Sequence, residues 1–147
     1  PAFVNSPLKP QFVIVGGPVQ SGAEVNDGRS AGAYVGHVDN IADYIYAADL
    51  VIVPLLSGSG IRTKIIEAVG CGKYVVSTET GAEGIDTHAC GEQLRLIADK
   101  DWEQFISAVK EIIPRVKDSQ ELPSAFFLST YNNTTIANSV AKFILGK

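Results

Sequence analysis

A glycine-containing loop beside charged side chains is the part of this sequence whose residue types could do chemistry. Residues 57–72 read Ser-Gly-Ser-Gly-Ile-Arg-Thr-Lys-Ile-Ile-Glu-Ala-Val-Gly-Cys-Gly. The first turn of a helix leaves amide groups unpaired and attracts anions, and Gly58 and Gly60 would let the backbone approach one closely. Arg62 and Lys64 would add positive charge. The loop therefore predicts a site for a phosphate-like anion.

Glu67 could extend this site to a second chemical group. It lies within i+3 and i+4 range of Lys64 and Thr63 on the predicted helix. Its carboxylate can accept hydrogen bonds from paired hydroxyl groups such as those of a ribose. A phosphate near Gly60 and a sugar near Glu67 would describe a nucleotide. The same spacing fits a glycine turn before an amphipathic helix with a solvated Lys64–Glu67 pair, and spacing alone gives both interpretations about equal weight.

A strand and a helix must position this loop. Residues 50–56 are apolar without alternation, which is typical of a parallel strand covered on both faces; a short buried helix would look similar, but the length and β-branched residues favour a strand. From residue 61 to residue 70, apolar and polar side chains fall on opposite sides at helical spacing. The apolar side comprises Ile61, Ile65, Ala68 and Val69, and the polar side Arg62, Thr63, Lys64 and Glu67.

Strands and helices alternate along the chain. Strands are expected at 12–15, 33–37, 50–56, 74–78 and 93–97, and helices at 41–48, 61–70, 101–113 and 125–145. This order predicts an α/β fold with a Rossmann-like parallel sheet flanked by helices and a C-terminal helix. Ligands should then bind outside the carboxyl ends of the strands. The half-polar strand at 93–97 is expected near the sheet edge.

Several local features refine this pattern. Asp39 or Asn40 should cap the helix at 41–48. Residues 78–85 follow a strand end and form a second candidate ligand loop, with a plain turn as an equal alternative. Pro114 should end the helix at 101–113. The expected core stripe of that helix comprises Trp102, Phe105, Ile106, Val109, Ile112 and Ile113.

Length and composition favour a globular protein of one domain, residues 1–147. Within it, residues 1–11 are expected as a lead-in segment and 115–124 as a connector to a terminal helical region at 125–145. A net charge of −4 argues against a general nucleic-acid surface. No apolar run has the length of a transmembrane helix. The chain begins Pro-Ala and contains no methionine, which suggests an excised or processed segment.

Metal chemistry has little support in the sequence. Cys71 and Cys90 are expected as free thiols, and His37 and His88 lack the spacing of a ligand pair. We therefore expect no metal site. The absence of a secretory signal pattern makes a cytoplasmic protein the default.

Several motifs in order resemble a known family. They are Val35-Gly36, the helix 41–48 followed by Asp49, Gly58-Ser-Gly-Ile-Arg-Thr-Lys-Ile-Ile-Glu-Ala68, Gly72-Lys-Tyr-Val-Val-Ser-Thr78 and Gly81-Ala-Glu-Gly-Ile85. The chain resembles the C-terminal, nucleotide-sugar-binding domain of group 1 glycosyltransferases of the GT-B fold. The resemblance spans about residues 12–113 and is strongest across 34–86.

The resemblance implies a role for each matched position. Lys64 would add charge beside the donor diphosphate, and Glu67 would take the ribose hydroxyls. The diphosphate loop would comprise Gly58, Ser59, Gly60, Ile61, Arg62 and Thr63; backbone groups of Gly36, His37 and Val38 would border the nucleobase; and Thr80, Gly81 and Ala82 would lie beside the nucleotide.

The chain also departs from the family pattern. Many members carry a glutamate facing the donor sugar in a Glu-x7-Glu spacing, but Ser59 stands eight residues before Glu67. Catalytic residues therefore stay unassigned. Family domains open with a further strand and a glycine turn with basic residues, and an N-terminal domain binds the acceptor. We expect this chain to be truncated at its N-terminal edge and to lack that domain.

The leading hypothesis is the donor-binding domain of a retaining glycosyltransferase. It would serve transfer of a hexose-type sugar from a UDP- or GDP-sugar to a saccharide or lipid-linked acceptor, with no further cofactor. Membrane association would come only through the missing domain, and the chain alone is expected to be inactive. The alternative is a nucleotide-binding or structural module without turnover. A P-loop nucleotidase fits worst, because Thr63 and Ile65 stand where glycine and Ser or Thr are required.

Overall fold

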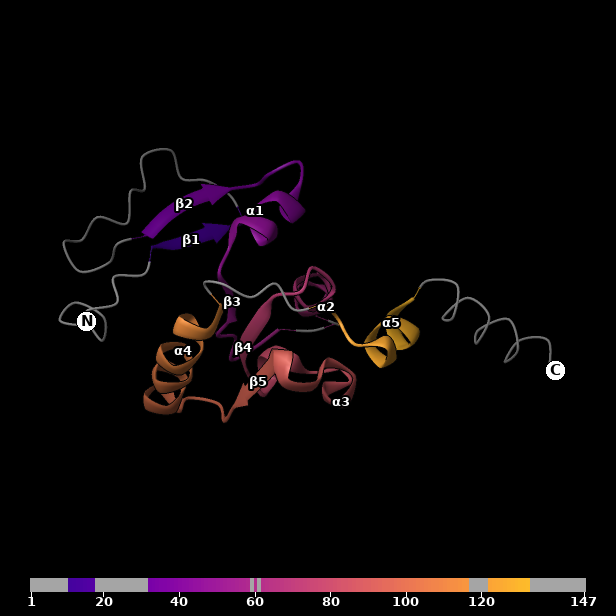
Figure 1. Cartoon of the computed structure of the whole chain (residues 1–147). Coiled ribbons are helices and arrows are strands. Elements are labelled where there is room, and N and C mark those ends of the chain that lie inside the picture. Colours follow the sequence, from indigo (N-terminus) through magenta and orange to yellow (C-terminus); the bar gives the residue numbers. More distant parts are fainter. Residues whose placement is uncertain (1–10, 18–31, 59, 61, 117–121, 133–147) are drawn as a thin grey trace. The chain divides into compact units, whose positions relative to one another are not determined.

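Two parts of the chain are folded around parallel strands, with helices beside them (Figure 1). The computed structural model describes residues 11–17, 32–58, 60, 62–116 and 122–132 of the 147. By its contacts the chain divides into two compact units, Pro1–Tyr44 and Ile45–Lys147. Parallel strands, flanking helices and a helix toward the C-terminus confirm the predicted α/β, Rossmann-like class.

The first unit contains two parallel strands, β1 (Phe12–Val15) and β2 (Gly32–Gly36). Their register shifts after Ile14, so that Val15 pairs with Gly36. The amide of Gly16 donates to the Gly36 carbonyl at 2.6 Å, and the Tyr34 hydroxyl donates to the Gly16 carbonyl at 2.9 Å. These bonds join the carboxyl ends of the two strands.

The helix α1 (Ile41–Ala47) begins after a side-chain cap. The side-chain oxygen of Asn40 accepts a hydrogen bond from the Ala42 amide at 3.1 Å, and its amide nitrogen donates to Asp43 at 2.9 Å. Of the two predicted capping residues, Asn40 is therefore the one whose side chain reaches the first turn.

The second unit contains a three-stranded parallel sheet in the order β3–β4–β5. The strands are β3 (Leu50–Val53), β4 (Tyr74–Thr78) and β5 (Leu94–Ile97). In this sheet β5 is an edge strand, as predicted. β3 ends at Val53 and not at Leu56, because Pro54 has no amide hydrogen for the ladder. All three carboxyl ends lie at one edge.

Helices cover both faces of β4. The helices α2 (Thr63–Gly70) and α4 (Trp102–Val116) both contact β4 and lie on either side of it in Figure 1. The strand residues Val75, Val76, Ser77 and Thr78 are all buried, as a strand covered on both faces requires. The predicted apolar side of α2 is confirmed where the structure describes it: Ile65, Ala68 and Val69 are fully buried.

Short helices complete the second unit. A 3-10 turn, η1 (Thr80–Ala82), follows β4, and α3 (Thr87–Cys90) leads through η2 (Gly91–Gln93) into β5. The sequence patterns missed α3, although Asp86 caps it by accepting from the Ala89 amide at 3.1 Å. α5 (Ala125–Tyr131) packs on α2 and α3. It lies within the predicted helical region at 125–145, of which residues 133–145 fall outside the described part.

Two expectations for α4 were wrong. The helix continues through Pro114 to Val116, which also removes residues 115 and 116 from the expected connector. Pro114 is exposed while Val116 is buried, so burial of the last turn outweighs one lost hydrogen bond on the solvent side. Trp102 is 42% exposed, lies at the helix start and makes a T-shaped ring contact with Phe105. Phe105, Val109 and Ile112 form the buried stripe as predicted.

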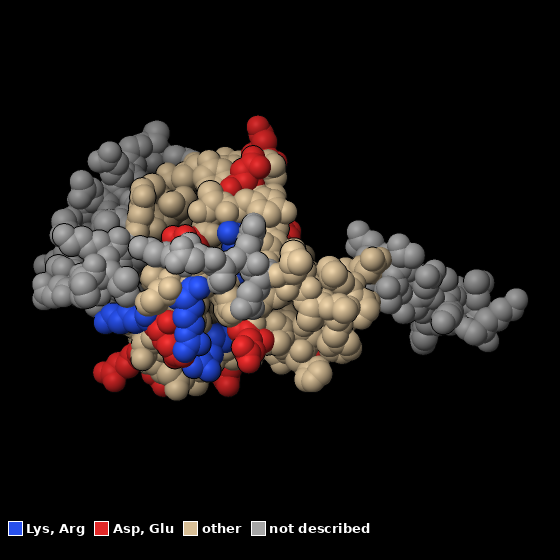
Figure 2. All heavy atoms as spheres, in the orientation of Figure 1, with Lys and Arg blue, Asp and Glu red and all other residues tan. Residues whose placement is uncertain are grey.

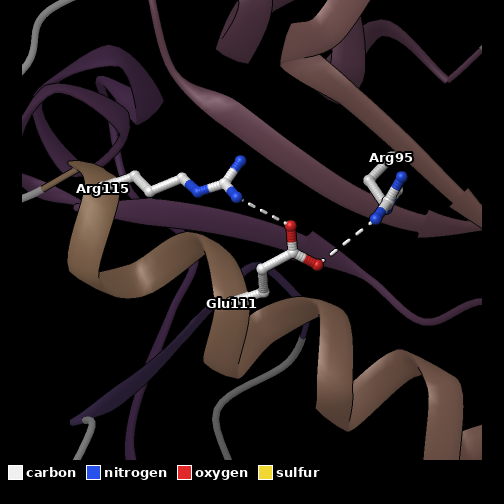
Figure 3. A network of polar contacts seen from close by, with 3 residues as sticks. All are labelled: Arg95, Glu111 and Arg115. Carbon is white, nitrogen blue, oxygen red and sulfur yellow. Dashed lines mark hydrogen bonds and ion pairs between the residues drawn. The ribbon is translucent and has the colours of Figure 1, made fainter.

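Charged side chains of both signs lie on the surface of the second unit. Glu111 of α4 bridges Arg95 of β5 at 3.3 Å and Arg115 at 3.0 Å (Figure 3). All three are well exposed, so solvent screens this network and its contribution to stability is small. On the face shown in Figure 2, basic side chains stand beside acidic ones. None of the helices described here has the length and apolar character to cross a membrane.

Candidate functional site

Both glycines of the central loop have backbone conformations that suit glycine. Gly58 has φ of +130° and Gly60 has φ of +89°, values that side-chain-bearing residues rarely adopt. The loop connects β3 to α2, as the sequence predicted. Ser59 and Ile61 lie outside the described residues.

The charged groups of the loop gather at the start of α2. Arg62 occupies the N-cap position, and its guanidinium lies against Gly58: a Cβ there would stand 2.7 Å from Nη2. A guanidinium carries only donors, so it cannot accept bonds from the first-turn amides as a usual N-cap side chain does. The Ile65 amide donates to the Arg62 carbonyl at 2.9 Å, so the amides of Thr63 and Lys64 are the ones that this side chain leaves for an outside acceptor.

The polar side of α2 is open to solvent. Thr63, Lys64 and Glu67 are all exposed, and Arg62 is partly buried. Glu67 follows Thr63 by four residues, so it lies one helical turn beyond the start of α2. The structure thus places a cationic helix start and an exposed carboxylate along one helix, as the sequence predicted.

The second candidate segment, Thr80–Ala82, uses its own amides internally. The Thr80 amide donates to Asp99 at 3.0 Å, and the Gly81 amide donates to the Thr78 hydroxyl at 3.0 Å. The Ala82 amide donates to the Glu79 carbonyl at 3.1 Å. Gly81 and Ala82 are buried. Any contact of this segment with a ligand would therefore come from groups other than these three amides.

This segment is tied to the end of β3. The Thr78 hydroxyl donates to the Leu55 carbonyl and lies 3.4 Å from the Val53 carbonyl. A Cβ on Gly81 would stand 2.6 Å from the same Val53 oxygen, so only glycine fits. The strand ends of β3 and β4 therefore bring the two candidate loops to one edge of the sheet.

Asp99, which follows β5, joins the same edge. One carboxylate oxygen accepts from the Thr80 amide and the other from the Thr80 hydroxyl. These hydrogen bonds lower the pKa of the Asp99 carboxyl, because they stabilise its charged form. The sequence patterns missed both Asp99 and the role of Thr78. Their position directly at the carboxyl ends of predicted strands was the available signal.

Gly36, His37 and Val38 belong to the first unit. Gly36 is buried with φ of +78°, and His37 is exposed. Their placement beside a nucleobase stays a prediction. Among the described residues, no three His, Cys, Asp or Glu side chains gather in a way that could hold a metal ion.

Comparisons with known proteins place this arrangement in a family. A family model described as "Glycosyl transferases group 1" matches residues 2–115. An "Uncharacterized 44.6 kDa protein in cps region" of Klebsiella pneumoniae is 30% identical over 97 residues, which cover 60% of this chain and 25% of that protein. The chain thus corresponds to about a quarter of the length of this relative, and no solved structure matches it significantly. The family match covers most of the chain, which therefore belongs to the group 1 glycosyltransferases.

Proposed function

We propose that this chain binds the nucleotide-sugar donor of a GT-B glycosyltransferase. One observation carries the proposal: β3 delivers a loop with two positive-φ glycines to the start of α2, where Arg62 replaces an accepting N-cap side chain. A helix start with available amides and adjacent cations favours a diphosphate. Family membership supplies the sugar-transfer chemistry.

The two ends of the nucleotide would meet different groups. The diphosphate would lie at Gly58–Lys64, against the amides of the first turn of α2 and the cations Arg62 and Lys64. The ribose would lie one turn further along the helix, where Glu67 is exposed and can accept from both hydroxyls. Gly36, His37 and Val38 would meet the base through backbone groups. Thr80, Gly81 and Ala82 would form the wall beside the nucleotide.

The chemical role of this site would be to stabilise the leaving group, the nucleotide diphosphate. When the sugar departs, negative charge grows on the nucleotide diphosphate, and preorganised donors at that position lower the barrier. A hexose-type sugar from a UDP- or GDP-donor would be transferred to a saccharide or lipid-linked acceptor, in glycan biosynthesis. Retention of the anomeric configuration is inferred from the family resemblance alone. Acceptor binding would belong to a further domain of a longer protein.

A binding experiment tests the donor site. UDP and GDP are titrated into the 147-residue chain while amide resonances are followed by NMR. We expect shifts at the described residues from Gly58 to Lys64, and a roughly tenfold weaker Kd for Glu67→Ala, the loss of about 1.4 kcal/mol that one or two charged hydrogen bonds would produce. Glu103→Ala is the matched control, since Glu103 is an exposed helical glutamate on α4. Equal effects of the two substitutions would refute the site.

A second candidate function is a binding module without turnover. It is favoured by length, because the chain covers only 25% of its relative. Donor hydrolysis and sugar transfer by the 147-residue chain test the second candidate. We expect nucleotide binding without transfer, as for a donor-binding domain on its own, and measurable transfer by this chain would remove the second candidate.

A further inference from the structure

Thr78 is the point at which three backbone segments meet. It is the last residue of β4 and is 1% exposed. Its hydroxyl donates to the Leu55 carbonyl in the segment that follows β3, and accepts from the Gly81 amide in η1. A single buried hydroxyl thus serves as donor to one loop and acceptor from the other.

The bond to Leu55 matters because it anchors an exposed segment, residues 54–58, to a buried hydroxyl. Pro54 ends the β3 ladder, and the Leu55 side chain is 40% exposed, so side-chain packing does not fix its backbone. Leu55 lies only three residues before Gly58. The hydrogen bond from Thr78 therefore gives the backbone a fixed point between the end of β3 and the start of the glycine loop.

Ser77 shows what the neighbouring hydroxyl does instead. It is also fully buried, but it donates to the carbonyls of Val53 and Thr78, at 3.2 and 2.9 Å. Both acceptors lie within strands. Ser77 therefore supports the sheet, whereas Thr78 reaches past the end of β3.

We propose that Thr78 is a positioning residue for the nucleotide site, acting through the Leu55 carbonyl on the loop at Gly58 and Gly60. The proposal rests on the proposed donor-binding function. Thr78 itself does not touch the nucleotide: its hydroxyl is already engaged with Leu55 and Gly81. Its hydrogen bond to Leu55 would fix the backbone that leads to Gly58, against which the Arg62 guanidinium lies.

Three substitutions in the 147-residue chain test this assignment. Thr78→Val keeps the shape and removes the hydroxyl, Thr78→Ser keeps the hydroxyl, and Ser77→Ala removes the neighbouring buried hydroxyl. For each we would measure Tm, the amide shifts of Gly58 and Gly60 without ligand, and the Kd for UDP and GDP. We expect Thr78→Val to move both amide shifts and raise the Kd about tenfold. Thr78→Ser should stay within about twofold of the parent Kd.

The control and the ligand-free readout keep the outcomes distinct. Ser77→Ala should lower Tm while leaving the Kd and the Gly58 and Gly60 shifts unchanged; if it raises the Kd as much as Thr78→Val, the role is merely structural and the proposal is overturned. If the parent chain binds neither nucleotide, the donor-binding function fails, but the ligand-free shifts still decide whether Thr78 positions the loop.

A measurement on the parent chain covers the case in which Thr78→Val does not fold. The Leu56 amide reports on the bond from Thr78, since it shares a peptide unit with the Leu55 carbonyl that accepts it. Nucleotide that shifts Gly58 and Gly60 should then also shift Leu56. Binding that leaves Leu56 unperturbed would overturn the coupling.

Discussion

The guanidinium of Arg62 lies against the backbone of Gly58, and a Cβ on Gly58 would stand 2.7 Å from Nη2 and 3.0 Å from Nη1. Gly60 has no such neighbour, since nothing described lies within 4 Å of its Cβ position. Both glycines have positive φ. An alanine at Gly60 would therefore add backbone strain alone, whereas an alanine at Gly58 would add strain and also displace the Arg62 side chain.

This relationship predicts different results for two alanine substitutions. Gly58→Ala and Gly60→Ala should each cost about 1–3 kcal/mol of backbone strain in urea denaturation. Only Gly58→Ala should also push the flexible Arg62 head group aside, so its Kd for UDP or GDP should approach that of Arg62→Ala. A further rise in Kd when Gly58→Ala is added to Arg62→Ala would contradict an effect through the arginine.

Gly81 and Gly70 form a matched pair for stability. A Cβ on Gly81 would lie 2.5 Å from Ser77 Oγ and 2.6 Å from the Val53 carbonyl, both in the buried core. We expect Gly81→Ala to lower the free energy of unfolding by about 3 kcal/mol. Gly70 ends α2, and its added Cβ would make an ordinary 3.8 Å contact with Phe127.

Gly70→Ala should accordingly be neutral or stabilising by up to about 1 kcal/mol, because alanine has the higher helix propensity. Chemical denaturation of both variants measures the difference. A loss at Gly70 as large as that at Gly81 would show that steric contact is not the cause.

We expect the hydrogen bonds between Asp99 and Thr80 at the start of η1 to be lost in acid. Its two hydrogen bonds to Thr80 lower the pKa of its carboxyl below the ordinary value of 3.8. The interaction therefore stabilises the folded chain fully above that value and is lost as the pH falls through the lower, folded-state pKa. In an NMR titration, the Thr80 amide and the Asp99 carboxyl should share one midpoint below 3.8.

Asp99→Asn serves as the control for this titration, since it removes the ionising group. The Thr80 amide should then lose that acidic transition. An Asp99 midpoint at or above the ordinary value would contradict the hydrogen-bonded geometry.

The two cysteines should differ in thiol reactivity. Burial raises the pKa of Cys90 to about 11, and the nearby Asp86 carboxylate adds to the shift. At pH 8 its thiol is therefore protonated as well as shielded, whereas Cys71 is partly exposed. Ellman's reagent should react quickly with one thiol in the native chain and with the second only after denaturation.

Cys71→Ser should abolish the fast phase of this reaction. If the fast phase survives in that variant, Cys90 is accessible and its burial at the end of α3 is wrong.

Local sequence patterns were sufficient to predict several strands, one helix face and the loop glycines of this protein. β1 and β4 lie where their apolar runs predicted, the buried side of α2 follows its helical spacing, and Gly58 and Gly60 have the conformations expected of loop glycines. These features depend on local backbone preference and on which side chains avoid water, and both are properties of the order of residues.

Other features depended on segments that are distant in the sequence. α4 continues through Pro114 because Val116, in its last turn, is buried. Trp102 is 42% exposed although its spacing matched the core stripe. Asp99 meets Thr80 across 19 residues and Thr78 meets Leu55 across 23. The sequence by itself determined the strands, the helix faces and the glycine loop. Only the tertiary structure decided that the Thr78 hydroxyl binds Leu55 and that the Asp99 carboxylate binds Thr80. These hydrogen bonds join segments at strand ends, and only the parallel sheet brings those ends together.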